Sequence, residues 1–168
     1  MAGPSLETDR LLLRPFREED HAPYAVMCAD EEVMRHIGTG VTLSAPDAWR
    51  SMAVILGHWA LRGYGMFAIE VKATGELAGR VGFLDPPGWP GFELGWLLGR
   101  AHWGNGYAYE GAKACLDHAF VALGRERVIS LIRPGNTRSV RVAERLGERL
   151  AGEVELLGSK ALVYEIRA

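Results

Sequence analysis

The chain has 168 residues, of which 48% are hydrophobic and 24% are charged. This length fits one domain and the hydrophobic content supports a packed core, so we expect residues 1–168 to form a single domain. The net charge of −2 gives no indication of a broad basic surface for nucleic acid, and no run of 18 or more apolar residues predicts a membrane span. Any site for an anion must therefore be local.

The cysteines and histidines give no indication of a redox motif or a metal site. Cys28 and Cys115 form no CxxC motif and fall in segments expected to be helical, so we interpret them as small buried hydrophobic residues. The five histidines form no HxxxH or HExxH pair, and no metal site is expected. Residues 1–11 lack the apolar core of a signal peptide. We expect a cytoplasmic protein.

The first 62 residues predict one strand followed by three helices. Thr8–Phe16 alternates weakly in hydrophobicity and is interrupted by Pro15, which is typical of a strand end. Helices are expected over Arg17–Asp30, Asp30–Ile37 and Pro46–Arg62.

The third of these helices carries an apolar stripe. Trp49, Ala53, Leu56 and Ala60 recur at helical spacing, and we expect Trp49 and Trp59 to pack into the core.

The next segment predicts a hairpin and then a loop. Tyr64–Lys72 and Leu77–Asp85 are expected strands joined by an Ala-Thr-Gly-Glu turn. Three prolines exclude ladder pairing over Asp85–Gly91, which must be a loop. At the end of the chain, Arg149–Leu157 and Lys160–Arg167 are expected strands joined by Gly-Ser.

Between these parts lies the most informative segment, with the order strand, glycine turn, helix, strand, helix. The strand Phe92–Gly99 precedes a glycine turn and a long helix that ends near Gly124. The strand Arg127–Ile132 precedes a helix that starts at Asn136. Glycines at a helix start let its free N–H groups approach an anion, so the turn predicts a phosphate site. The whole order predicts a mixed α/β sheet with helices on both faces.

Four interpretations of the glycine turn compete. A P-loop requires Gly-Lys-Ser/Thr, but Tyr107 follows Gly106 here. A dinucleotide fingerprint requires a third glycine where Tyr109 stands. An ordinary tight turn would have no ligand. The fourth interpretation is a loop that binds acyl-coenzyme A.

Several segments support that fourth interpretation through a resemblance. Trp103-Gly104-Asn105-Gly106-Tyr107-Ala108 is similar to the Gln/Arg-x-x-Gly-x-Gly/Ala loop of the GNAT N-acetyltransferase superfamily, with Trp103 in place of the leading Gln/Arg. This form resembles the branch containing the ribosomal-protein N-terminal acetyltransferases. The other matching segments are Thr8–Pro15, Glu93–Trp96, Asn136–Ser139 and Glu144–Gly147. The resemblance covers most of the chain.

The resemblance implies a fold and a reaction. The fold is a mixed, mostly antiparallel sheet of six to seven strands with about four helices and a central splayed parallel pair, Phe92–Gly99 and Arg127–Ile132. The reaction is direct transfer of acetyl from acetyl-CoA to a primary amine, either a protein N-terminus or a small molecule. Relatives in this branch are often dimers, so a homodimer is one state that the resemblance allows, while the residues leave the oligomeric state open.

It also implies roles for individual residues. The backbone of Trp96, Leu97 and Leu98 would pair with the pantetheine arm, and Asn136 would hold a pantetheine amide. Ser139 would protonate the leaving thiolate. The pyrophosphate would lie on the N–H groups of Trp103, Gly104, Asn105, Gly106, Tyr107 and Ala108. From the residues alone, Asn136 is equally a helix cap and Ser139 a first-turn serine bonded to backbone.

Charged residues beside these segments have two interpretations each. Arg138, Arg141 and Arg145 share one helix face and, with Arg100, would suit a cofactor with several phosphates or form a solvated surface. Glu93 is the first candidate for the general base because its strand leads to the thioester, although it could instead pair with an arginine.

The residues that would meet the amine acceptor are less clearly indicated by the sequence. Glu70, Asp85 and Tyr164 are alternative bases, and Trp89 lies in the proline-rich loop where an acceptor could enter. Two other functions remain open at this point. One is a non-catalytic acyl-CoA-binding module or sensor, and the other is a nucleotide-binding regulator that uses the same glycine turn.

Overall fold

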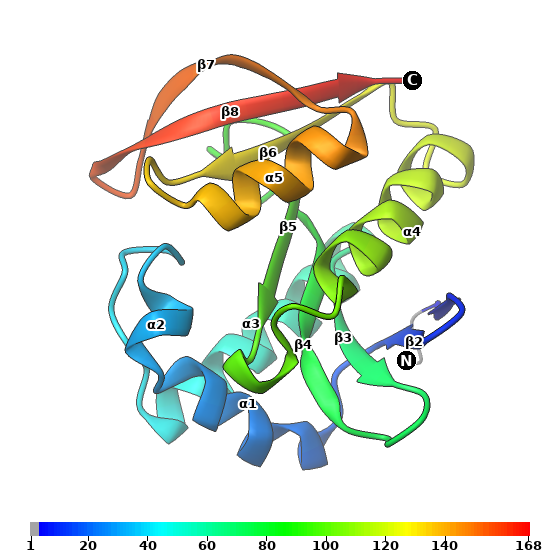
Figure 1. Cartoon of the computed structure of the whole chain (residues 1–168), viewed down its shortest axis with the longest axis vertical. Helices are drawn as coiled ribbons and strands as arrows, with labels where there is room; N and C mark the ends of the chain where they lie inside the picture. Colours follow the sequence, from blue (N-terminus) through cyan, green and yellow to red (C-terminus); the bar gives the residue numbers. More distant parts are fainter. Residues whose placement is uncertain (1–3) are drawn as a thin grey trace.

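A computed structural model describes residues 4–168, so part of the N-terminal segment assessed for a signal peptide lies outside the described residues. One eight-stranded sheet runs through the molecule in the order β1-β2-β3-β4-β5-β6-β8-β7 (Figure 1). Neighbouring strands are antiparallel except for β5 and β6, which confirms the predicted mixed sheet with one parallel pair. The strands are β1 (Leu6–Glu7), β2 (Leu11–Arg14), β3 (Met66–Val71), β4 (Leu77–Leu84), β5 (Glu93–Leu98), β6 (Arg127–Ile132), β7 (Arg149–Leu156) and β8 (Ser159–Arg167).

The strand count exceeds the expected six to seven because the first expected strand is shorter and belongs to a hairpin. β1 precedes it and pairs with it, and the N–H of Thr8 donates to the carbonyl of Leu11 at 3.0 Å to close the turn. At the other end of the chain, the turn between β7 and β8 is formed by Leu157 and Gly158, both with positive φ, instead of the expected Gly158-Ser159.

Residues 4–168 contain five α-helices where about four were expected. They are α1 (His21–Cys28), α2 (Glu31–Met34), α3 (Ala45–Arg62), α4 (Tyr107–Val121) and α5 (Thr137–Leu146). The expected first helix is split, since Glu18–Asp20 forms a 3₁₀ turn (η1) before α1; a second 3₁₀ turn, η2, spans Arg100–His102. Ser44 caps α3 by accepting from the N–H of Asp47 at 3.2 Å.

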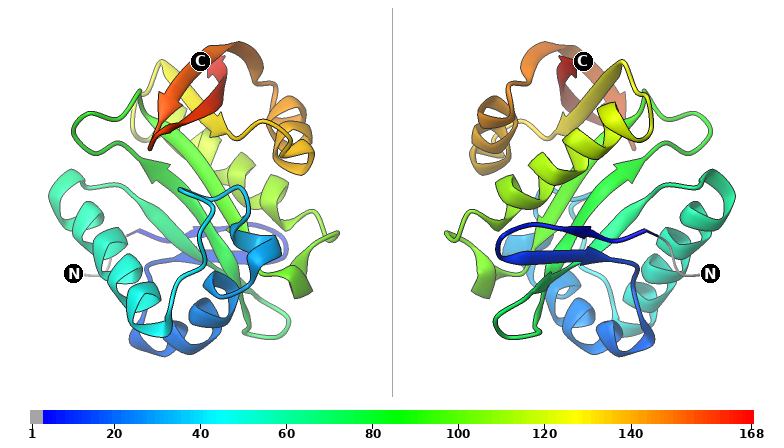
Figure 2. Two further views of the ribbon diagram at one scale, coloured as in Figure 1. Left: turned by 90° about the vertical axis from the view of Figure 1, so that its left-hand side faces the viewer. Right: turned by 90° about the vertical axis from the view of Figure 1, so that its right-hand side faces the viewer.

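The helices cover both faces of the sheet, as Figure 2 shows from two sides. α4 packs on one face through Ala112, Cys115, Leu116 and Ala119, whose spacing of three or four residues makes one stripe. α1 and α3 cover the opposite face around a second cluster that includes Met52. Cys28 and Cys115 are buried and unpaired, as predicted.

The buried face of α3 is not the predicted one. Ala48, Met52 and Ile55 are buried, whereas the side chain of Trp49 is 46% exposed and its indole N–H donates to Glu18. The prediction for Trp49 was therefore wrong. The two apolar stripes lie one residue apart on the helix, so spacing alone does not identify the face that meets the sheet. Trp59 packs against the core and donates to the carbonyl of Met66 at 2.8 Å.

Candidate active site

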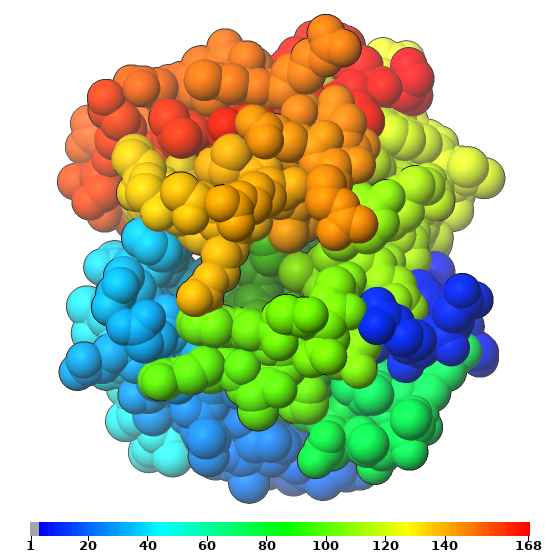
Figure 3. Space-filling view, viewed as in Figure 1, coloured from blue at the N-terminus to red at the C-terminus, as the bar shows by residue number. Residues whose placement is uncertain are grey.

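The site is a cleft at the centre of the sheet, where β5 and β6 diverge. These strands pair only at Glu93 and Ile129. The cleft has a volume of about 780 Å³, and its walls come from β5, the start of α4, α5 and the α2 segment. Figure 3 shows this hollow between the orange α5 and the yellow-green segment at the start of α4, with green β5 at its floor.

The start of α4 forms one wall. Gly104 and Gly106 both have φ of +78°, a conformation that is costly for residues with a side chain. Glu110 donates the first helical N–H, to the carbonyl of Gly106. The N–H groups of Tyr107 and Ala108 precede that bond and have no acceptor within the helix. This end of α4 therefore presents N–H donors and the positive end of the helix dipole to the cleft.

The opposite wall is α5. Asn136 caps it, with its side-chain oxygen accepting from the N–H of Ser139 at 3.3 Å. The Ser139 hydroxyl oxygen accepts from the indole N–H of Trp96 at 3.2 Å, which joins α5 to β5. The hydroxyl proton of Ser139 remains available to donate in another direction.

Three arginines of α5 line the cleft, as their spacing predicted: Arg138, Arg141 and Arg145. The Arg138 guanidinium lies 3.9 Å from the ring centre of Trp103 across the cleft, and that of Arg145 lies 4.1 Å from the ring centre of Tyr109. These charges add to the positive end of α4.

Arg100 differs from this group. Its guanidinium makes two hydrogen bonds with the carboxylate of Asp30, at 2.9 and 2.5 Å, and it does not contribute to the cleft wall. Arg100 instead fixes η2 to the segment before α2.

Most of the predicted cofactor-binding residues surround this cleft. They are Trp96, Leu97, Leu98, Trp103, Gly104, Gly106, Tyr107, Ala108, Asn136, Ser139 and Arg145. Asn105 is absent from the wall, since its amide turns back to donate to the carbonyls of His102 and Trp103. The carbonyl of Leu97 lies against Gly79 of β4, so the backbone groups of the alternate residues Trp96 and Leu98 face the gap.

Glu93 lies where the two strands part. One carboxylate oxygen accepts from the indole N–H of Trp89 at 2.7 Å. Burial raises the pKa of Glu93 to about 7, while Trp89, Arg80 and Leu131 act in the opposite direction. A carboxyl group with a pKa of about 7 can take up or release a proton at neutral pH.

The weaker base candidates have other partners. Glu70 accepts from Arg14 at 2.6 Å, and Asp85 accepts from the hydroxyl of Tyr64 at 3.1 Å. Tyr164 is buried in a small apolar cluster under α5.

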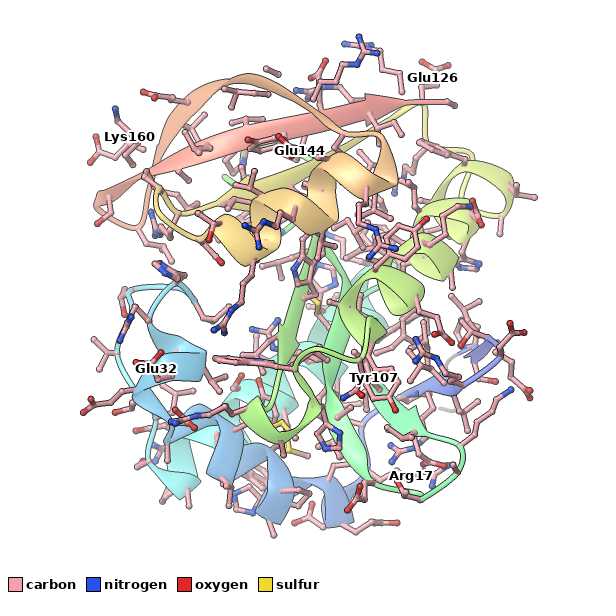
Figure 4. All side chains as sticks on the ribbon, in the orientation of Figure 1. Arg17, Glu32, Tyr107, Glu126, Glu144 and Lys160 are labelled. Carbon is pink, nitrogen blue, oxygen red and sulfur yellow. The ribbon has the colours of Figure 1, made fainter. Side chains whose placement is uncertain are left out.

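Sequence reasoning missed two parts of the site. The α2 segment supplies a wall through Glu32, His36 and Ile37; Figure 4 shows Glu32 and Tyr107 on opposite sides of the cleft. Ser130 and Glu148 are both buried, and the Ser130 hydroxyl lies 3.0 Å from a carboxyl oxygen of Glu148. A serine within the apolar strand Arg127–Ile132 was the one available signal for this pair.

Two further properties bear on the class of protein. Within the described range 4–168, no three metal-ligating side chains come together. In the same range, no helix combines the length and apolarity needed to cross a bilayer.

The sequence matches the family model described as the acetyltransferase (GNAT) domain over residues 10–149. The chain belongs to the GNAT acetyltransferase family. The uncharacterized protein YkkB of Bacillus subtilis (strain 168) is 33% identical over 98% of this chain and 96% of its own length. An acetyltransferase from Agrobacterium tumefaciens str. C58 has a TM-score of 0.88 and 34% identity, covering 100% of this chain and 96% of its own. These matches identify the chain as an acyltransferase.

The resemblance to the ribosomal-protein branch is also confirmed at the level of fold. RimL, a ribosomal-protein acetyltransferase whose structure contains coenzyme A, has a TM-score of 0.78 at 17% identity, covering 98% of each chain. At that identity the likeness establishes a shared architecture.

Proposed function

We propose that this GNAT acyltransferase moves an acetyl group from acetyl-CoA directly to a primary amine, on a protein N-terminus or a small molecule. Glu93 carries the proposal. It is a carboxylate with a pKa raised to about 7 at the point where β5 and β6 separate, on the strand whose later residues Trp96, Leu97 and Leu98 line the cleft, although Glu93 itself does not line it. We also propose that residues 1–168 act as one domain in the cytoplasm and can form a homodimer.

The cleft suits the chemical groups of acetyl-CoA. The pyrophosphate would be held by the N–H groups of Tyr107 and Ala108, and further phosphate charge by Arg141 and Arg145. A Cβ atom at Gly104 would meet nothing within 4 Å, so the space above this turn is open to a ligand. The exposed edge of β5 at Trp96 offers backbone groups to the amides of the pantetheine arm.

Acetyl-CoA supplies an activated thioester, and the protein must manage two protons around it. Glu93 would accept the proton that the ammonium loses, directly or through water. Ser139 would donate to the leaving sulfur, because the Trp96 indole N–H already occupies its oxygen and directs its own proton elsewhere. The N–H of Trp96 would stabilise charge that develops on the carbonyl oxygen.

The test is amine-dependent release of coenzyme A thiol from acetyl-CoA over a panel of amino acids, peptides with free N-termini, polyamines and aminoglycosides. We expect release with at least one amine, with an acetylated product seen by mass spectrometry. Glu93→Gln should lower kcat by roughly 10²–10³. For the wild type, kcat/KM should rise with pH up to about 7, because the base works in its ionised form.

Glu126→Gln makes the same chemical change at an exposed position outside the cleft and should keep full activity. Tight binding of coenzyme A without thiol release for any amine would identify a non-catalytic acyl-CoA-binding module instead. Thermal stabilisation by ATP or NAD, with none by acetyl-CoA, would identify a nucleotide-binding regulator.

A further inference from the structure

The parallel pairing of β5 and β6 stops abruptly beyond Glu93 and Ile129. In this register the next ladder bond would run from the N–H of Leu131 to the carbonyl of Leu94. A side chain takes the Leu94 carbonyl instead, since the Ser130 hydroxyl lies 2.8 Å from the Leu94 oxygen. The Leu131 N–H lowers the pKa of Glu93. Side chains therefore stand in for the ladder bond at the base of the cleft.

Ser130 is itself in contact with a third group. Its oxygen lies 3.0 Å from Oε1 of Glu148. Glu148 is only 2% exposed and follows the last turn of α5. A hydroxyl has one proton, and the carbonyl of Leu94 can only accept. If Glu148 were ionised, Ser130 would face two acceptors with one proton. A protonated Glu148 satisfies all three groups, because it donates to Ser130 and Ser130 donates to Leu94.

The surroundings of Glu93 and Glu148 also favour a charge on Glu93 and a proton on Glu148. Glu93 accepts a hydrogen bond from the indole N–H of Trp89, and the charge of Arg80 and the N–H of Leu131 also lower its pKa. Within residues 4–168, Oε2 of Glu148 is buried without a hydrogen-bond partner. Glu93 is the charged group that acts on Glu148. Two nearby carboxylates, one partly and one fully buried, avoid carrying charge together, so the donors around each decide which one ionises.

We propose that Glu148 is a positioning residue that keeps its proton when Glu93 loses one, donates to Ser130 to hold the Leu94 carbonyl at the base of the cleft, and thereby leaves the negative charge on Glu93. This assignment rests on the proposed base role of Glu93. It gives the paired acids separate tasks, one holding the strands apart and the other exchanging the proton. Burial raises the pKa of Glu148 to about 7, as it does that of Glu93, so the hydrogen-bond pattern decides which of the two ionises first.

The direct test is infrared spectroscopy of the ligand-free protein over a pH titration. We expect carbonyl stretches from two protonated carboxylic acids, and the band that Glu148→Gln removes should persist to higher pH than the band that Glu93→Gln removes. Glu155→Gln, an exposed change on β7, should leave both bands in place. The reverse order of loss would overturn the assignment. This measurement stands apart from acetyltransferase activity, so it can fail or succeed independently of the proposed function.

Stability against pH gives a second readout. A group whose pKa is raised on folding contributes stability that is present below its unfolded pKa, 4.5, and is lost as the pH rises to about 7. The gain in thermal midpoint of Glu148→Gln over wild type should therefore be near zero below pH 4.5, grow between these values and then level off. A gain that is independent of pH would contradict a buried titrating acid.

Kinetics with the best amine test the positioning role. Glu148→Gln keeps a neutral donor and should stay within about threefold of wild-type kcat/KM at pH 7. Glu148→Ala and Ser130→Ala leave a buried acceptor unsatisfied and should raise KM for acetyl-CoA roughly tenfold. If Glu148→Gln instead lost activity as strongly as Glu93→Gln, Glu148 would be the charged member and the proposal would be wrong.

Discussion

At the scale of single residues, Ser139 shows how one contact can prepare a side chain for chemistry. The Trp96 indole N–H donates to its oxygen, which leaves its hydroxyl proton free for the cleft. Ser139→Ala should therefore lower kcat by roughly 10- to 100-fold while KM for acetyl-CoA changes little. Steady-state rates measure both. Thr137→Ala, which removes another hydroxyl from the same wall, is the matched control and should keep near-normal kcat. Equal losses in both variants would indicate a wall effect instead.

The site residues that belong to a sequence motif could be predicted from the sequence. Asn136 and Ser139 follow a strand and open a helix, so their place at a helix start could be read from the order of elements. The partnership of Ser130 and Glu148 could not, because 18 residues and a helix separate them and their meeting depends on where α5 ends. Likewise, the desolvation that raises the pKa of Glu93 arises only when other segments pack around it.

At the scale of elements, the N-terminus of α4 defines the expected phosphate site. Gly106→Trp should reduce affinity for coenzyme A by more than about tenfold, because Gly106 lines the cleft directly before the free N–H groups and a bulky side chain there, with its Cβ 3.5 Å from the Arg10 guanidinium, would disturb this turn. Gly124→Trp is the matched control. Gly124 also has positive φ, +61° against +78°, and lies just beyond the other end of α4. Both variants carry a similar backbone cost, of about 1–2 kcal/mol.

Isothermal titration calorimetry measures the affinity, and thermal midpoints confirm that the two variants are destabilised alike. Unchanged affinity in Gly106→Trp would show that the phosphate site lies elsewhere.

The elements themselves divide into a predictable and an unpredictable class. α4 has one apolar stripe and a glycine start, and its place was predictable from both. α3 has apolar residues on two adjacent stripes, and tertiary packing selected the one with Met52 over the one with Trp49. β1 has only two residues, Leu6 and Glu7, too few for a periodic pattern.

At the scale of the whole molecule, the cleft separates two parts of one sheet. β1 to β5 form the larger part and β6, β8 and β7 the smaller, with α4 and α5 in contact on one face. A single register pair between β5 and β6 joins the parts across the sheet. Mixed topology was predictable from element order, whereas the width of the cleft depends on long-range side-chain contacts such as Ser130 with Leu94.

The larger part depends on a buried ion pair that fixes η1 and α1 to the sheet. Arg14 of β2 is 5% exposed and makes bonds of 2.7 and 2.9 Å with the two oxygens of Asp20, which is 3% exposed. Arg14 also donates to Glu70 at 2.6 Å, and Asp20 accepts from the N–H of Arg17 at 2.7 Å.

Asp20→Ala should lower the free energy of unfolding by about 3–5 kcal/mol, because it leaves the Arg14 charge buried with one partner fewer. Urea denaturation measures this loss. Asp117→Ala removes an exposed partner of Lys113 and should cost less than about 1 kcal/mol. Similar small losses in both variants would mean that packing, and not the ion pair, holds η1 and α1 in place.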